Sequence, residues 1–296
     1  MVEKASVAFI DHVIVSNHLW QEKLISRSVT RARSSVFVNH VDPTIFYRRT
    51  RTRDDGKFII LFPGSFQWHQ GLDIAITAFA KIKDRIPNAE FHIYGRGEVA
   101  DLTRLAQELG VADRVLFRGG VDLEDMPDVI ASADLGVVPK RADSFGNEAY
   151  STKIMEFMSQ GLPVVCSRTK IDSFYFDDSN VRFFPSGDAT AMAEAILEVY
   201  EEKGRKELLI QGGLKYVAQH NWDSQKKTYL DLVDSLATES FESGDTAPLT
   251  AIPVRNDAKS DARNPVSTLQ SSEWVRRSPT SVTTQRSSGA TSGGRS

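Results

Sequence analysis

The sequence predicts an α/β fold, in which a Rossmann-like parallel sheet carries helices on both faces. From residue 57 onward, short apolar stretches rich in β-branched residues alternate with longer stretches whose apolar residues recur at helical spacing. The turns between them are short, and most contain glycine or proline. This alternation indicates parallel strands joined by right-handed crossovers, and 296 residues with 41% hydrophobic composition suffice for a sizeable core.

The expected elements follow one another regularly after an irregular start. Before residue 50, the pattern predicts a strand over 7–16, a helix over 18–26 and a strand over 36–38. The expected strands of the main sheet are 58–62, 90–94, 115–117, 135–138, 164–166 and 181–184. Helices are expected over 72–86, 99–109, 125–133 and 151–160, and the stretch 189–237 is helical in pattern.

Composition divides the chain into three regions. Residues 1–50 are too few for a domain of their own, whereas 51–238 carry the whole alternating pattern. Residues 239–296 are rich in Ser, Thr, Pro, Gly and Arg and contain few large apolar side chains. Such a segment cannot offset the entropy lost on ordering, so we expect a disordered tail there.

Charge and cysteine usage narrow the class of protein. The formal net charge is -3 and the sequence pI is about 6.1, so there is no general basic field for nucleic acid. The basic cluster at 48–53 is interpreted as a solvated connector, with a binding patch as the alternative. Cys166 is the single cysteine, which suits a reducing compartment, and we expect a cytoplasmic location. No apolar run approaches the roughly 18 residues that a transmembrane helix needs.

The segments that follow the strands are candidate ligand sites, because ligands of open parallel sheets bind beyond the carboxyl ends of the strands. These segments are 63–71, 95–98, 119–121 and 139–153. In the last of them, Ser151 is placed to cap the following helix. The free N–H groups of Ser151, Thr152 and Lys153 would then point outward and form a phosphate site.

Two carboxylates flank this helix start. Glu148 precedes it and Glu156 lies in its first two turns, three residues after Lys153. A carboxylate accepts two hydroxyl groups at once, which suits the vicinal diol of a ribose or sugar ring. The combination predicts a sugar-nucleotide site. The alternative interpretation is that Glu156 is a surface residue paired with Lys153 and that Ser151 is only a cap.

The segment 146–158, in which seven residues separate Glu148 from Glu156, is followed by Gly-Leu-Pro-Val-Val at 161–165. Together these segments resemble the signature of the large GT-B family of retaining glycosyltransferases. Segments 13–17, 39–42 and 131–140 resemble three further motifs of that family, in the same order. The resemblance runs from about residue 7 to residue 235.

The resemblance implies a hexosyltransferase that uses a UDP-, GDP- or ADP-sugar, with no metal and no other cofactor, in polysaccharide or glycoconjugate biosynthesis. By position, Glu148 is the catalytic residue, which binds the donor sugar and stabilises charge at the anomeric carbon. Glu156 binds the ribose hydroxyls. The other donor-binding positions are Gly64, Ser65, His69, Gln70, Gly71, Gly95, Val121, Ser151, Thr152 and Lys153.

Two positions depart from the family pattern. The family usually has Arg after the first glycine of the loop at 64–71 and Lys before the second, whereas this chain has Ser65 and Gln70. Two cations that would neutralise the leaving diphosphate are therefore missing. His69 and Lys153 are the candidate substitutes, with Arg96 and Arg141 as further ones. A weak or inactive transferase, serving as a nucleotide-sugar-binding module, is therefore the alternative function.

Residues 1–50 resemble only the last part of a first, acceptor-side domain, so we expect either a truncated product or a second polypeptide that supplies the acceptor half. The isolated chain is then expected to bind donor but to transfer sugar poorly. A third function is an NAD(P)-dependent oxidoreductase, because Gly95, Gly97 and Ala100 form a Gly-x-Gly-x-x-Ala fingerprint. Against it, the next expected strand ends in Arg118 rather than in an acid.

Overall fold

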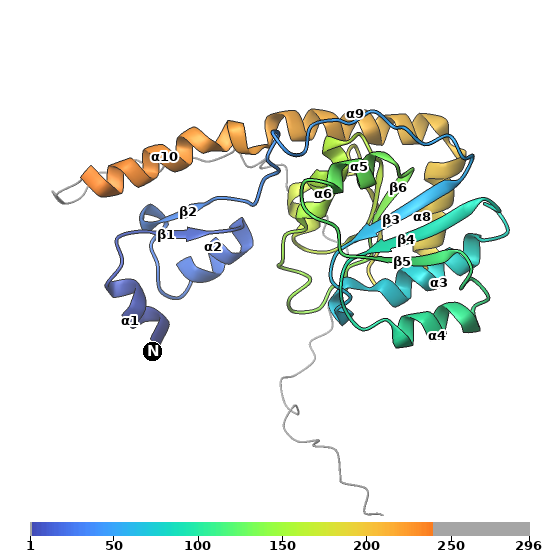
Figure 1. Cartoon of the computed structure of the whole chain (residues 1–296). Coiled ribbons are helices and arrows are strands. Elements are labelled where there is room, and N and C mark those ends of the chain that lie inside the picture. The colour runs from blue at the N-terminus through green and yellow to red at the C-terminus, as the bar shows by residue number, and fades with distance from the viewer. Residues whose placement is uncertain (1, 239–296) are drawn as a thin grey trace, which may run out of the picture. The chain divides into compact units, whose positions relative to one another are not determined.

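The structure, a computed structural model, describes residues 2–238 and contains a parallel six-stranded sheet with helices on both faces. The predicted fold class is therefore confirmed (Figure 1). In spatial order, the strands are β5 (Val115–Gly119), β4 (Ala89–Tyr94), β3 (Phe58–Pro63), β6 (Leu135–Val138), β7 (Val164–Arg168) and β8 (Arg182–Pro185).

The strand order places a switch point between β3 and β6. From β3 the chain adds β4 and β5 on one side, and it then returns to add β6, β7 and β8 on the other side. β3 is buried along its whole length and pairs in parallel with both β4 and β6. Because the crossovers diverge at this point, a crevice is expected beyond the carboxyl ends of β3 and β6.

Side chains of β3 alternate between two hydrophobic cores, one on each face of the sheet. Ile60 and Phe62 pack into the first core, whereas Ile59 and Leu61 pack into the second. The first core is closed by α3 (Leu72–Ile82), α4 (Ala100–Glu108) and α8 (Ala189–Glu201), and the second by α5 (Met126–Ala131) and α6 (Thr152–Ser159). Figure 1 shows α3 and α4 on one side of the sheet and α5 and α6 on the other.

The first residues differ from the expectation. The predicted strand over 7–16 is wrong at its start, because Val7 lies in helix α1 (Val2–Ala8) and only β1 (Val13–Val15) is extended. The length of β1 is set by its partner β2 (Ser34–Val36), with which it forms a separate parallel pair. Apolar β-branched residues favour a strand only where a neighbouring strand is available to pair with them.

Other elements follow the expected ranges within a few residues. Helix α2 (His18–Ile25) begins at Asn17, whose side chain accepts a hydrogen bond from the Trp20 N–H. The helical stretch near the end contains α8, α9 (Lys203–Gln219) and α10 (Trp222–Thr238), separated at Glu202 and at 220–221.

The sequence pattern missed three short elements, each of a single turn: η1 (Arg31–Arg33), η2 (Trp68–Gln70) and α7 (Asp172–Tyr175). One turn is too short to show a helical period. The tail expected over 239–296 lies outside the described residues. Along residues 2–238, none of the helices combines the length and the apolar character that crossing a bilayer requires.

Candidate functional site

A pocket of about 290 Å³ lies at the carboxyl end of β3, where the strand order predicts a crevice. Its wall comes from the end of β3, from the segment between β5 and α5, and from the first two turns of α6. The lining residues are Pro63, Gly64, Val121, Leu123, Met126, Thr152, Lys153 and Glu156. Five residues predicted from the sequence to bind the donor are thus brought together: Gly64, Val121, Thr152, Lys153 and Glu156.

The start of α6 supplies unpaired backbone donors to this pocket. Ser151 occupies the cap position, as predicted, but its side chain makes no capping hydrogen bond, so the predicted side-chain cap is not found. The N–H groups of Thr152 and Lys153 have no acceptor within the helix, because the first turn of any α-helix lacks them. The positive end of the helix dipole adds to their attraction for an anion.

Lys153 carries the positive charge of the pocket. Its Nζ donates a hydrogen bond to Oε1 of Gln70 at 2.8 Å and lies 4.4 Å from the centre of the Phe62 ring. A Cβ added to Gly64 would lie 2.9 Å from this nitrogen, so the lysine fills the space beside the first loop glycine. Burial lowers the pKa of Lys153 to about 8.

Glu156 faces the same pocket from one turn further along α6. Burial raises the pKa of its carboxyl group, while the charge of Lys153 and a hydrogen bond from Thr152 oppose that rise. Among the described residues, no ion pair joins Glu156 to Lys153, whose ammonium group binds Gln70 instead. The interpretation of Glu156 as a surface residue paired with Lys153 is therefore wrong.

Glu148 does not line this pocket. It lies three residues before the start of α6, and its carboxylate forms an ion pair with Lys23 of α2. The hydrogen bond from Lys23 is the main reason why the pKa of Glu148 lies below its ordinary value. Asn17, which is fully buried, donates its amide to the backbone oxygen of Glu148 at 3.0 Å. The segment 13–17 and the loop before α6, far apart in sequence, therefore meet.

Two of the predicted loop glycines allow close backbone packing. A Cβ on Gly95 would lie 1.8 Å from the carbonyl oxygen of Gly64, and one on Gly71 would lie 2.0 Å from that of Pro139. Both have positive φ, which only glycine adopts without strain. A side chain at Gly95 would therefore collide with the end of β3, and the donor-binding role of Gly95 stays a prediction.

Two other candidate cations, His69 and Arg141, contact residues outside the pocket. His69 packs against the ring of Phe145 and contacts Gln70, which in turn accepts a hydrogen bond from Lys153. Arg141 forms a bidentate ion pair with Asp73, with nitrogen–oxygen distances of 2.9 and 2.7 Å. Neither of them, nor Ser65, lines the pocket, whereas Lys153 does.

The structure also disfavours the dinucleotide fingerprint. Its glycines follow β4, one strand away from the switch point. A Cβ on Gly97 would lie 2.7 Å from the Cβ of Phe66, so this glycine is needed for packing within the protein.

The sequence pattern gave no role to a buried ion pair that supports the loop before α6. Lys140 and Asp172 are 3% and 0% exposed, and Nζ lies 2.8 Å from Oδ2. Lys140 also donates to the backbone oxygen of Ala149 at 2.7 Å, directly after Glu148. A lysine at the end of an apolar strand was the only signal available.

Within residues 2–238, no group of three or more His, Cys, Asp or Glu side chains is placed to hold a metal ion.

Comparison with known proteins shows which family this part of the chain is similar to. Residues 57–202 match the model of a family described as "Glycosyl transferases group 1". This stretch contains the pocket, Glu148 and all of α6.

Curated relatives agree with this match over part of their length. The chain is 26% identical over 230 residues to an uncharacterized glycosyltransferase of Methanocaldococcus jannaschii, covering 73% of this chain and 57% of that protein. It is 25% identical to a phosphatidyl-myo-inositol mannosyltransferase of Mycobacterium leprae, covering 60% and 47%. The chain thus spans about half the length of these relatives.

Solved structures share the fold. Sucrose-phosphate synthase from Thermosynechococcus elongatus superimposes with a TM-score of 0.68 at 24% identity, covering 80% of this chain and 61% of that one. The Anabaena protein HepE, in complex with UDP-glucose, superimposes with a TM-score of 0.68 at 19% identity, covering 79% and 67%. At these identities the likeness concerns the fold.

Proposed function

We propose that this chain binds a nucleotide-diphospho-sugar and transfers its hexosyl group to an acceptor with retention of configuration. The observation that carries the proposal is the gathering of the α6 start, Lys153 and Glu156 in one pocket at the switch point of the sheet. The family match over 57–202 supports a glycosyltransferase, and the Anabaena neighbour was solved in complex with UDP-glucose.

In this proposal the donor lies across the start of α6. Its diphosphate accepts hydrogen bonds from the N–H groups of Thr152 and Lys153 and from the Lys153 ammonium group. The ribose hydroxyls donate to Glu156, and the base lies near Val121. As the glycosidic bond breaks, negative charge collects on the leaving diphosphate, and these fixed donors stabilise it without a metal ion.

Glu148 is proposed to act at the sugar end of the donor. Its pKa is held low, so the side chain is a carboxylate at neutral pH and can accept hydroxyl groups of the sugar. The same charge would stabilise the positive charge that develops at the anomeric carbon. Lys23 already binds this carboxylate, so a bound sugar would share it with that lysine.

A catalytically weak or inactive nucleotide-sugar-binding module is the second candidate. It is favoured by Ser65 and Gln70, which stand where the resembling family carries cations. Gln70 accepts a hydrogen bond from Lys153, and it adds no charge. Leaving-group stabilisation would then depend on one lysine and the backbone.

Thermal unfolding with UDP-, GDP- and ADP-sugars tests the proposed donor. One of the three should raise the melting temperature, because a ligand of the native state stabilises it by mass action. Glu156→Gln should weaken this ligand by about tenfold or more, since the change replaces a charged acceptor of two hydroxyl groups. Glu108→Gln, on the exposed surface of α4, is the matched control. The donor proposal fails if no sugar nucleotide protects the protein, or if both variants bind like the wild type.

A second measurement separates an enzyme from a binding module. With an acceptor half supplied, Glu148→Ala should reduce transfer by orders of magnitude and change nucleotide affinity little if the chain is catalytic. A binding module would show no transfer in the wild type and would respond to Glu148→Ala only through affinity.

The proposed location is the cytoplasm, where fluorescent tagging would place the full chain.

A further inference from the structure

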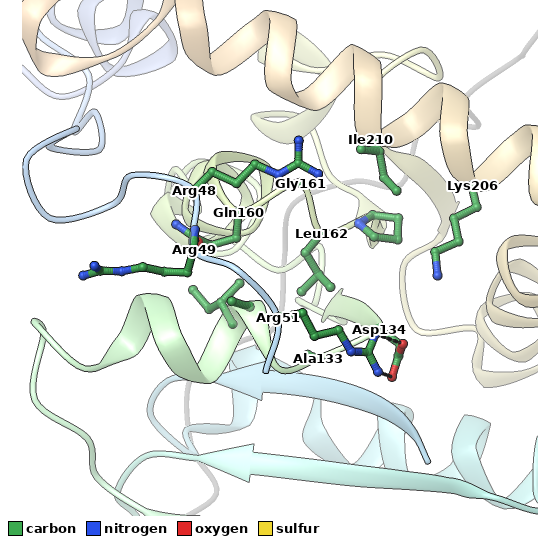
Figure 2. A pocket seen from close by; sticks show the side chains of 13 residues that line it. Arg48, Arg49, Arg51, Ala133, Asp134, Gln160, Gly161, Leu162, Lys206 and Ile210 are labelled. Carbon is green, nitrogen blue, oxygen red and sulfur yellow. Dashed lines mark hydrogen bonds and ion pairs between the residues drawn. The ribbon is translucent and has the colours of Figure 1, made fainter. Parts of the chain in front are cut away.

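A second pocket, of about 220 Å³, lies at the amino ends of the strands, whereas the donor pocket lies at their carboxyl ends. It adjoins the starts of β6 and β7, since Asp134 directly precedes β6 and Pro163 directly precedes β7. Figure 2 shows its wall, formed by the connector 48–51, the end of α6 and one side of α9. This is the basic cluster that the sequence pattern interpreted as a solvated connector.

Four cationic side chains line this pocket against a single carboxylate. Asp134 is occupied: it forms ion pairs with Arg51 and Arg53 and accepts the N–H of Ile59 at 2.9 Å. Its charge is therefore already shared by two arginines.

Two of the four cations, Arg48 and Lys206, have no acidic partner among the described residues. Arg49 lies 3.6 Å from Asp128 and stacks on the ring of Tyr47. Over the residues that the structure describes, neither Arg48 nor Lys206 forms an ion pair or a side-chain hydrogen bond. An excess of positive charge thus faces a partly enclosed space, where a small anion would be held more strongly than on an open surface.

Arg48 is held in position by the end of α6. The buried amide of Gln160 accepts the N–H of Arg49 at 2.8 Å and donates to the backbone oxygen of Tyr47 at 2.9 Å. The backbone on both sides of Arg48 is therefore fixed to one side chain. Gly161 has φ of +67°, and a Cβ there would lie 3.3 Å from the guanidinium carbon of Arg48. The glycine leaves room for the arginine, which a freely solvated connector would not need.

The rest of the pocket is apolar. Leu162, Pro163 and Ile210 form this part of the wall, and Figure 2 shows Ile210 between Arg48 and Lys206. This pocket is smaller than the donor pocket, which suits a small ligand. A guanidinium group binds phosphate oxygens in a bidentate manner, and an ammonium group adds a point charge.

We propose that this pocket is a binding site for a small phosphate-bearing anion, held by Arg48 and Lys206. The phosphate group lies between the two cations, and any organic part packs on Leu162 and Ile210. The site is separate from the proposed donor pocket, since the two lie at opposite ends of α6: Lys153 lines one, and Gln160 lines the other. The proposed phosphate site therefore does not depend on the proposed donor site.

Calorimetric titration of the full chain tests the proposal, with inorganic phosphate and glycerol 3-phosphate as probes at constant ionic strength. Both probes should bind at one site in the wild type. Arg48→Gln and Lys206→Gln should each weaken binding by about tenfold or more, because each removes a charged partner of the phosphate. Lys203→Gln, one turn earlier on α9 and outside the pocket, is the matched control and should bind like the wild type.

The donor pocket also attracts phosphate, so a second variant separates the two sites. Lys153→Gln should leave this binding unchanged if the phosphate lies between Arg48 and Lys206. Tighter binding of glycerol 3-phosphate than of phosphate would identify a phosphate ester as the ligand, and equal binding would identify free phosphate. The proposal is overturned if Arg48→Gln and Lys206→Gln bind like the wild type, or if Lys153→Gln abolishes binding. Unfolding curves of all variants should show that they remain folded.

Discussion

Replacing Lys153 with methionine tests whether a buried charge is kept for ligand binding at the expense of stability. Methionine has nearly the length of the lysine stem but no charge, so it should fill the space beside Gly64 and Phe62. In the free protein, burial lowers the pKa of Lys153 from 10.5 to about 8. The ammonium group is thus unfavourable in the folded state at neutral pH, and its removal should stabilise the fold.

The size of this effect follows from the pKa. A difference of 2.5 between 10.5 and about 8 corresponds to about 3 kcal/mol at pH 7. Because the change leaves Oε1 of Gln70 without its donor, we expect a gain of about 1 to 3 kcal/mol. Nucleotide binding should change in the opposite direction. Losing one charged hydrogen bond to the diphosphate costs about 1.5 to 3 kcal/mol, which is about ten- to hundredfold in Kd.

The dependence on pH supplies an internal check. Between pH 8 and 10.5 the unfolded wild type binds more protons than the folded protein, so wild-type stability rises with pH across this window. The advantage of Lys153→Met should shrink over the same window. Urea unfolding at pH 7 and pH 10 measures the stability difference between variant and wild type. Calorimetry with UDP, GDP and ADP at pH 7 measures Kd. Lys203→Met is the exposed control. Unchanged nucleotide affinity, or a variant less stable than wild type at pH 7, would refute the reasoning.

Three further substitutions test the support around the site. Gly95→Ala should destabilise the fold by about 3 kcal/mol in thermal unfolding, because its Cβ would meet a carbonyl oxygen at 1.8 Å; Gly204→Ala, in open space on a helix, should cost nothing, and equal effects would contradict this. Asp172→Asn should cost about 3 to 5 kcal/mol in urea unfolding, because it leaves a buried lysine unpaired. Asp178→Asn, in an exposed pair, should change stability by less than about 1 kcal/mol. Gln70→Lys should tighten UDP, GDP or ADP binding about five- to tenfold at low salt, with the gain lost at high salt; weaker binding would contradict the proposed phosphate position.

Local patterns in the sequence determined the main domain. Alternation of period 2 and period 3.6 gave the strands and helices from Phe58 onward, because each period reflects which faces of an element are buried. The start of α6, with Lys153 and Glu156 three residues apart, was equally readable, since both residues lie on one short helix. The local pattern gave a wrong prediction at the start of the stretch 7–16, where strand-forming residues lacked a partner strand.

Only the tertiary structure decided which distant residues meet. Gln70 bonds to Lys153, Lys23 to Glu148, and Arg48 packs over Gly161. Each of these contacts joins segments more than 80 residues apart. Whether they form depends on the order of the strands, and hence on which side each crossover takes. Periodicity encodes the burial of a face but not its neighbour, so the sequence determined the elements and the folded sheet determined the two pockets.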